Sequence, residues 1–328
     1  MPTLTEANRQ HRGVVRLSAW CLVLMLAICG NPPAPIPGAL AQESSEPDLQ
    51  GRYVQIERVE TVLVPATVLD KKGRPVGGLK RGDFRLTEDG KSIPIEYFAT
   101  EAEAPVAIAF VLDVSGSMRQ EGKLDAAKRA IGAFVDTLRP RDTFGLIAFA
   151  DAQVTWITDF TTNRAVFKKR LGVQEALGQT ALFDALAACP RLVDEGVQSR
   201  KAIVLFSDGL DNASHTDAQR AIELARRASV PIYAISFIPA PVELLGQEKR
   251  DALLVLGGFA RETGGHDYAV RNPEELGVAI AKIQQELRHQ YVIGFEPMSR
   301  KGAAYRRIRL ETNRGGLRVR CRTGYQQD

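Results

Sequence analysis

The sequence predicts an α/β fold: a doubly wound, mostly parallel sheet inserted in a small β-sandwich formed by the flanking segments. Short β-branched runs alternate with amphipathic helical patterns over residues 104–288, as in parallel sheets covered by helices. The flanks, residues 52–103 and 289–328, contain only strand patterns, and three strands are marginally stable alone. We therefore expect the 289–328 segment to pair with the 52–103 segment in one sandwich.

The composition is that of an ordinary globular protein, with 45% hydrophobic and 25% charged residues among 328. The net charge of +4 is small, which excludes an overall polyanion-binding character. Arginines alternate with apolar residues over Arg307–Leu310 and Leu317–Arg322. We interpret them as a solvated outer sheet face, with an anion-binding patch as the alternative. No exposed aromatic residues are interleaved with them, so no nucleic-acid partner is expected.

The N-terminus has the pattern of an export signal. Three arginines precede the apolar stretch Leu17–Gly30, and Ala39-Leu40-Ala41 follows it. This predicts a signal peptide over residues 1–41, cleaved before Gln42, and then a polar linker over 42–51. The apolar stretch is short for a membrane span, although an uncleaved anchor is the alternative. No later segment could span a membrane, so the mature protein is predicted to be secreted or periplasmic.

Six strands are predicted in the flanks, and the last two of them are expected to form a hairpin. In the first flank, the alternating apolar residues lie over Val62–Val68, Phe84–Leu86 and Ile93–Tyr97. In the second flank, a strand is expected over Tyr291–Phe295, and then a hairpin of Tyr305–Glu311 with Leu317–Arg322. After signal removal only Cys189 and Cys321 remain, and a disulfide between them is compatible with the sequence but not implied.

The central region alternates strands with helices. The predicted strands are Val106–Leu112, Phe144–Ala150, an antiparallel edge strand Val154–Thr158, Val204–Ser207, Ile232–Phe237 and His266–Val270. The predicted helices are Leu124–Leu138, one from Thr180 toward Val193, Thr216–Ala228 opened by a capping box of Thr216 and Gln219, and one that begins at Asn272 and extends to Leu287.

Polar oxygens follow the first central strand at once. The buried strand Val106–Leu112 ends in Asp113, and Ser115 and Ser117 come directly after it. A tight loop with D-x-S-x-S spacing can turn all three oxygens toward one point. Oxygen donors without nitrogen or sulfur suit Mg²⁺, Mn²⁺ or Ca²⁺ rather than zinc. The sequence therefore predicts a divalent-cation site at this strand end.

The Asp113-Val114-Ser115-Gly116-Ser117 stretch resembles the metal-ion-dependent adhesion site of von Willebrand factor type A domains. Two downstream segments resemble the rest of that motif, namely the loop Gly178–Leu182 with Thr180 and the strand Ile203–Gly209 with Asp208. The resemblance covers residues 105–288. Four short stretches of the flanks also resemble bacterial, notably acidobacterial, secreted proteins that carry this domain; they are Gly73–Val76, Asp83-Phe84, Glu88–Gly90 and Arg322–Tyr325.

The resemblance implies a ligand set. It places the strand of Asp113 beside that of Asp208, so that the ion lies where the strand order reverses. Ser115, Ser117 and Thr180 would bind the ion directly, and the two aspartates mostly through water. Mg²⁺ is the expected ion, with Mn²⁺ or Ca²⁺ as alternatives. The ion keeps its electrophilic character, so a partner protein can offer it a carboxylate. The expected function is thus a metal-dependent adhesion or interaction module.

Three other interpretations stay open. Asp113 and Ser117 could simply cap the following helix. A hydrolase could use Asp113 as its metal-site carboxylate, or the chain could be a structural envelope domain. No catalytic residue is expected, because phosphatases with a strand-end aspartate usually have a second aspartate where this chain has Ser115, and the sequence has neither a G-x-S-x-G elbow nor a P-loop. Asp211 is predicted to be a solvated loop residue, with a supporting role beside the metal ligands as the alternative.

Overall fold

The computed structural model describes residues 61–100, 105–151, 153–194, 200–227, 229–298 and 305–326. The predicted signal peptide, the linker and residues 52–60 lie outside these ranges. The central region forms a six-stranded sheet. In spatial order its strands are β10 (Asp267–Val270), β9 (Ile232–Phe237), β8 (Lys201–Ser207), β5 (Ala107–Asp113), β6 (Thr143–Ala150) and β7 (Gln153–Thr161).

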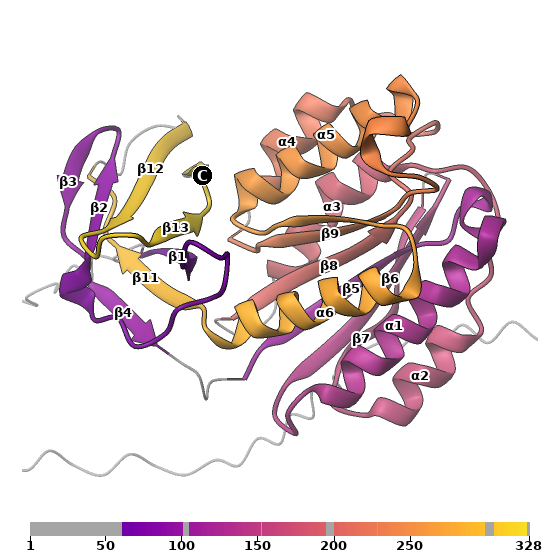
Figure 1. Ribbon diagram of the computed structural model, residues 1–328, viewed down its shortest axis with the longest axis horizontal. Helices are drawn as coiled ribbons and strands as arrows, with labels where there is room; N and C mark the ends of the chain where they lie inside the picture. The colour runs from indigo at the N-terminus through magenta and orange to yellow at the C-terminus, as the bar shows by residue number, and fades with distance from the viewer. Residues whose placement is uncertain are drawn as a thin grey trace, which may run out of the picture. The chain divides into compact units, whose positions relative to one another are not determined.

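The sheet is parallel except for β7, which pairs antiparallel with β6 at one edge, as predicted. Helices cover both faces (Figure 1). One face carries α1 (Lys123–Thr137), α2 (Arg164–Gly172) and α6 (Pro273–Arg288), and the other carries α3 (Leu182–Asp194), α4 (Ala218–Ala225) and α5 (Gln247–Thr263). The predicted α/β fold class is confirmed. The sequence patterns did not predict α2 or α5.

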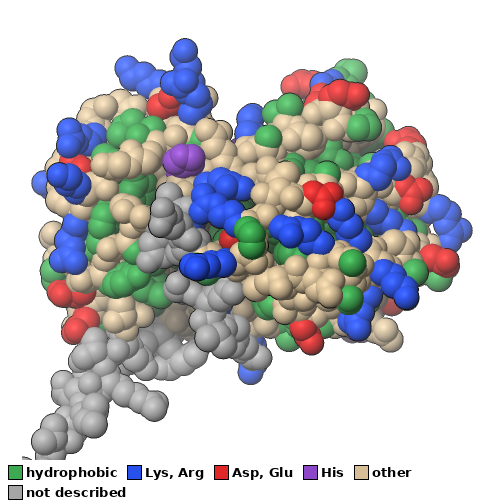
Figure 2. Space-filling model, turned by 90° about the horizontal axis from the view of Figure 1, so that it is seen from below, with side chains coloured by type: hydrophobic (Ala, Val, Ile, Leu, Met, Phe, Trp, Pro, Cys, Tyr) green, Lys and Arg blue, Asp and Glu red, His purple; other side chains and the backbone are tan. Residues whose placement is uncertain are grey.

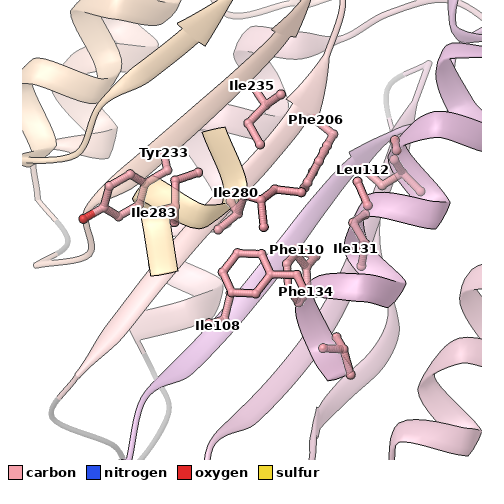
Figure 3. Close-up of a cluster of buried hydrophobic side chains, with 14 of the residues drawn as sticks. Ile108, Phe110, Leu112, Ile131, Phe134, Phe206, Tyr233, Ile235, Ile280 and Ile283 are labelled. Carbon is pink, nitrogen blue, oxygen red and sulfur yellow. The ribbon is translucent and has the colours of Figure 1, made fainter. Parts of the chain in front are cut away.

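The two layers of core follow from the alternation of side chains along the buried strands. In β5, Ile108, Phe110 and Leu112 pack with α1 and α6, whereas Ala109 and Val111 pack on the opposite face. Figure 3 shows Phe110 beside Phe134 of α1, and their ring centroids are 5.3 Å apart. Burying each such large apolar side chain stabilises the fold by roughly 1.5–3 kcal/mol. This packing fixes the position of the carboxyl end of β5, and therefore that of Asp113.

The two flanks build two antiparallel sheets that share one apolar core. The first sheet contains, in order, β13 (Arg318–Cys321), β1 (Val62–Leu69), β11 (Tyr291–Phe295) and β4 (Tyr97–Thr100). The second contains β14 (Gly324–Gln326), β12 (Tyr305–Thr312), β2 (Phe84–Glu88) and β3 (Lys91–Ile93). Every strand of the first flank therefore has a neighbour from the second flank or lies beside one that does.

Two local predictions in the flanks are wrong. The segment Ile93–Tyr97 is not one strand, because Ile93 ends β3 and Tyr97 begins β4 in the other sheet. Pro94 lies between them and has no N–H to offer a ladder. Similarly, β12 and β13 do not form a hairpin but belong to different sheets. Both strands still place their apolar side chains in the shared core, which is why periodicity alone could not separate the two arrangements.

The arginines of the last strands do not all lie on a solvated face. Arg307 and Arg309 are exposed, as predicted, but Arg320 contacts the buried Glu286 of α6. Arg322 is buried, and its guanidinium donates to the Ser229 hydroxyl and to a carbonyl of the central region. These arginines thus join the flanking strands to the central region. On the face drawn in Figure 2, Lys and Arg side chains are interspersed with Asp and Glu.

Two smaller predictions, on the start of α4 and on the two cysteines, can be compared with the structure. The α4 helix begins after Asp217, whose carboxylate accepts the Arg220 N–H, so the predicted capping box opened by Thr216 is wrong. Thr216 instead donates its N–H to Asp184 of α3. Cys189 and Cys321 are free thiols, and burial raises the pKa of Cys189 to about 12 and that of Cys321 to about 11. Neither thiol is therefore a thiolate at neutral pH.

Candidate functional site

The candidate site lies at the carboxyl edge of the sheet between β5 and β8. These two strands are parallel neighbours, and Leu112 is paired in register with Phe206. Asp113 and Ser207 therefore end adjacent strands at the same level, and Asp208 follows directly. The chain proceeds from β5 to β6 on one side and later to β8 and β9 on the other. The site thus occupies the point where strand order reverses, the usual ligand position in open α/β sheets.

Asp113 is fully buried, and both of its carboxylate oxygens accept hydrogen bonds. Its Oδ1 accepts the Ser115 N–H at 2.9 Å, and its Oδ2 accepts the Ser207 hydroxyl at 2.6 Å. Burial, with a smaller effect of the nearby Asp208 charge, raises the pKa of Asp113 to about 6 despite these hydrogen bonds. A cation in contact with this carboxylate would offset the cost of burying its charge.

The serine loop is held tightly beside Asp113. Ser115 is buried and Ser117 is half-buried, and their hydroxyl oxygens lie 3.1 Å apart. Between them, the Gly116 N–H donates to the carbonyl of Gly178 at 2.9 Å. This bond ties the serine loop to the loop that carries Thr180. The two hydroxyls are therefore preorganised by backbone contacts rather than by the helix that follows.

The threonine loop is clamped from two sides. The Thr180 N–H donates to Asn212 Oδ1 at 2.8 Å, and the Thr180 carbonyl accepts the Asn212 N–H at 3.0 Å. One residue earlier, Gln179 exchanges two bonds with Asp151: its N–H donates to Asp151 Oδ1, and its carbonyl accepts the Asp151 N–H, both at 2.7 Å. Asn212 and Asp151 thus position Thr180. No sequence pattern had marked either residue.

The carboxylate of Asp208 lies close to two lysine ammonium groups. Asp208 is 2% exposed, and its Oδ2 is 3.1 Å from Lys123 Nζ and 3.5 Å from Lys249 Nζ. Lys123 belongs to the first turn of α1 and Lys249 to the first turn of α5. Sequence reasoning missed both lysines. Lys249 carried no signal, because its helix was itself not predicted.

Asp211 is half-buried rather than solvated, so that prediction is wrong. Its Oδ1 accepts the Ser214 hydroxyl at 2.5 Å and the Phe183 N–H at 3.3 Å, which satisfies a free N–H at the start of α3. Asp211 therefore organises the loop after β8. Its neighbour Asn212 makes the contact to the threonine loop.

Of the five predicted metal ligands, Asp113 is the last residue of β5, and the other four lie on three loops at the same edge of the sheet; these four are Ser115, Ser117, Thr180 and Asp208. Two carboxylates and three hydroxyls are the hard donors that suit Mg²⁺, so this residue set fits a divalent cation chemically. Among the described residues, no three His, Cys, Asp and Glu side chains group as they would in a zinc centre.

Comparison with known proteins agrees with the family resemblance of the central region. Residues 108–210 match the family model of the von Willebrand factor type A domain. The predicted resemblance to this family is thereby confirmed for residues 108–210. The chain is 32% identical over 209 residues to a UPF0353 protein of Mycobacterium sp. (strain KMS) and 29% identical over 208 residues to one of Mycobacterium leprae. Each match covers 57% of this chain and 62% of the relative.

Several solved structures are similar to this chain. A von Willebrand factor type A protein from Catenulispora acidiphila superposes with a TM-score of 0.48 at 16% identity, over 82% of this chain and 74% of that one. An aerotolerance-related membrane protein from Bacteroides fragilis superposes with a TM-score of 0.44 at 24% identity, over 56% of this chain and 98% of that one. In the part of the chain described here, no helix is long and apolar enough to cross a membrane.

Proposed function

We propose that this protein is an exported, metal-dependent protein-binding module whose von Willebrand factor type A domain binds a divalent cation, most favourably Mg²⁺. The observation that carries the proposal is that Asp113, Ser115, Ser117 and Asp208 lie together at the switch point of the sheet, where the Gly116–Gly178 bond ties the serine loop to the loop that carries Thr180. Export rests on the sequence pattern of residues 1–41. The partner contributes a carboxylate, the hard anionic group that such a cation attracts.

The candidate ligands would have two different roles in binding the cation. The hydroxyls of Ser115, Ser117 and Thr180 would hold the cation, and Asp113 and Asp208 would balance its charge. A bound divalent cation supplies a Lewis-acidic position for an anionic partner group. Because the direct donors are neutral hydroxyls, little charge is transferred to the cation by the protein. The Ser207 hydroxyl donates to Asp113, and the side chains of Asn212 and Asp151 accept the N–H groups of Thr180 and Gln179. These hydrogen bonds keep the arrangement fixed before any partner arrives.

An apolar side chain beside the site favours a protein partner. Leu177 is 60% exposed, and its N–H donates to the carbonyl of Val114 within the serine loop at 2.8 Å. Aspartate or glutamate in a protein surface can present a carboxylate together with apolar neighbours that cover Leu177. Burial of such exposed apolar surface contributes to protein association.

The geometry gives less support to a hydrolase that uses Asp113 as its nucleophile. Both oxygens of Asp113 already accept hydrogen bonds from Ser115 and Ser207, and the residue is fully buried. A nucleophile needs an accessible oxygen within reach of the substrate. The binding function therefore accounts better for the arrangement.

The test combines metal titration with partner capture. Wild type, Asp113→Ala and Thr180→Ala proteins are titrated with Mg²⁺ and Mn²⁺ by calorimetry, and each captures partners from envelope extract in Mg²⁺ or in chelator. We expect both variants to keep the fold and to lose metal binding and capture in parallel. Equal capture by all three proteins in both conditions contradicts the metal-dependent mechanism. Turnover of a substrate that requires Asp113 would favour the hydrolase.

A further inference from the structure

A buried lysine lies in an unfavourable position next to the candidate metal site. Lys123 is 8% exposed and occupies the first turn of α1. A helix N-terminus carries partial positive charge, so an ammonium there is disfavoured. Its burial adds a further cost, because a charge must be removed from water. The stability of α1 therefore does not explain why a lysine occupies this position.

The carboxylate of Asp208 compensates for these costs. Lys123 Nζ donates to Asp208 Oδ2 at 3.1 Å, and the two side chains are almost completely removed from solvent. Lys249 approaches the same oxygen at 3.5 Å and donates to the Asp208 backbone carbonyl at 3.2 Å. Two ammonium groups thus surround one carboxylate oxygen.

The charges of the site then balance without any metal. Asp113 and Asp208 bring two negative charges, and Lys123 and Lys249 bring two positive ones. A carboxylate pair alone would attract a divalent cation strongly and would repel itself in its absence. The lysines offset the repulsion between the two carboxylates, and they also weaken the attraction of the site for a divalent cation.

On the basis of the function proposed above, we propose that the Lys123 ammonium, assisted by Lys249, is an internal competitor of divalent cations. It pairs with the Asp208 carboxylate and thereby lowers the affinity of the site for the cation. With a divalent cation bound, the four side chains leave the site positively charged rather than neutral. The site therefore favours a negatively charged partner group, and cation and carboxylate strengthen each other's binding. Lys123 is a positioning residue for Asp208 in this scheme, not a ligand.

The experiment measures the binding of Mg²⁺ and Mn²⁺ alone to the full-length chain by calorimetry. Lys123→Met removes the buried ammonium at similar length, and Lys249→Gln removes the more exposed one. Lys128→Met is the matched control, because Lys128 lies on the same helix but donates to the carbonyl of Gly172, away from the site. The control shows what the loss of any positive charge from α1 does.

We expect Lys123→Met to bind Mg²⁺ about tenfold more tightly than wild type, because a neighbouring unit charge of the same sign is removed. Lys249→Gln should tighten binding by about threefold, since its ammonium is better screened by solvent. Lys128→Met should leave the affinity unchanged. The melting temperature gives a second readout: saturating Mg²⁺ should raise it more in Lys123→Met than in wild type.

Equal or weaker affinity in folded Lys123→Met overturns the proposal. If that variant does not fold, equal or weaker affinity in Lys249→Gln overturns it instead. Wild-type binding that depends on Asp113 but not on either lysine refutes the competitor and leaves the proposed function intact. Binding by the lysine variants when wild type binds nothing supports the competitor and contradicts the proposed function. Absence of binding in every protein contradicts both.

Discussion

The hydroxyl of Ser207 donates to Asp113 Oδ2 at 2.6 Å, and this bond joins the ends of the two central strands. Ser207 is the last residue of β8 and Asp113 the last of β5. The candidate metal carboxylate is therefore oriented from two sides, by the neighbouring strand through Ser207 and by the serine loop through the Ser115 N–H. The other candidate ligands, the hydroxyls and Asp208, lie on the loops.

Ser207→Ala should lower both stability and metal affinity. The substitution leaves a buried carboxylate oxygen without its donor, and the loss of a hydrogen bond to a charged group costs about 1.5–3 kcal/mol. Urea unfolding measures the stability, and calorimetry measures the affinity for Mg²⁺. Ser236→Ala is the matched control. Ser236 lies on β9, in register with Ser207 of β8, and its buried hydroxyl has no hydrogen-bond partner in the described part of the chain. Equal losses in both variants would contradict the role of Ser207.

Asp113→Asn should stabilise the metal-free protein at neutral pH. The pKa of Asp113 is raised from 3.8 to about 6, so the protonated form favours folding. This contribution is fully present below pH 3.8 and is lost as the pH rises through 6. In chelator at pH 7.5 the variant should exceed wild type by roughly 3 kcal/mol in the free energy of unfolding.

The same difference should shrink toward zero at pH 3.5, where Asp113 is protonated in the folded chain and mostly protonated in the unfolded chain. Urea unfolding of both proteins across this pH range checks the prediction, and the subtraction removes the contributions of the other titrating groups. A difference that does not change with pH would show that burial of the Asp113 charge costs the fold nothing.

Gly178→Ala should displace the threonine loop. Gly178 has φ +78°, and a Cβ there would lie 2.4 Å from the Asp151 carboxylate, which holds Gln179. The variant should lose more stability than the cost of about 1–2 kcal/mol for a left-handed alanine, and it should bind Mg²⁺ more weakly. Gly73→Ala is the control, because Gly73 has φ +74° with open space around it. Unchanged Mg²⁺ affinity in folded Gly178→Ala would show that the loop position does not matter.

The strands could be predicted because buried strands are unbroken apolar runs, and Asp113, the two serines and Asp208 follow two of these runs directly. Thr180 follows no strand, and both Thr180 and the switch point were predicted only from the family resemblance. The supporting residues escaped prediction because their roles depend on distant contacts. Asp151 reaches Gln179 across 28 residues, and Lys123 reaches Asp208 across 85. No local pattern distinguishes such a residue from a solvated charge.

The same limit explains the errors in the flanks. The apolar sides of β12 and β13 face one core from opposite sheets, and a hairpin would show the same alternation. The helix α5 was missed although it is 17 residues long. Its few buried residues are spread among exposed ones, including Leu254, so the apolar face is weakly marked. Helices α2 and α5 therefore depend on tertiary packing more than on their own pattern.

The pairing of the flanks leads to a prediction about fragments. Strand β1 pairs with β11 and β13, and β4 pairs with β11, so the partner strands of both β1 and β4 lie beyond residue 288. A fragment of residues 42–103 should therefore show no cooperative unfolding, because its strands lack most of their neighbours. Cooperative unfolding of this fragment by urea would contradict a sandwich that needs both flanks.

A fragment of residues 104–288 should fold alone but be less stable than the whole chain. It keeps the six-stranded sheet and both helical layers, including every candidate metal ligand. It loses the contact of Arg320 with Glu286, whose carboxyl has a pKa raised by burial in the whole chain. Calorimetric titration should give the same Mg²⁺ affinity in the fragment and the whole chain, because the site contacts described here lie within residues 113–249. A folded fragment that no longer binds Mg²⁺ would show that the flanking sandwich helps to form the site.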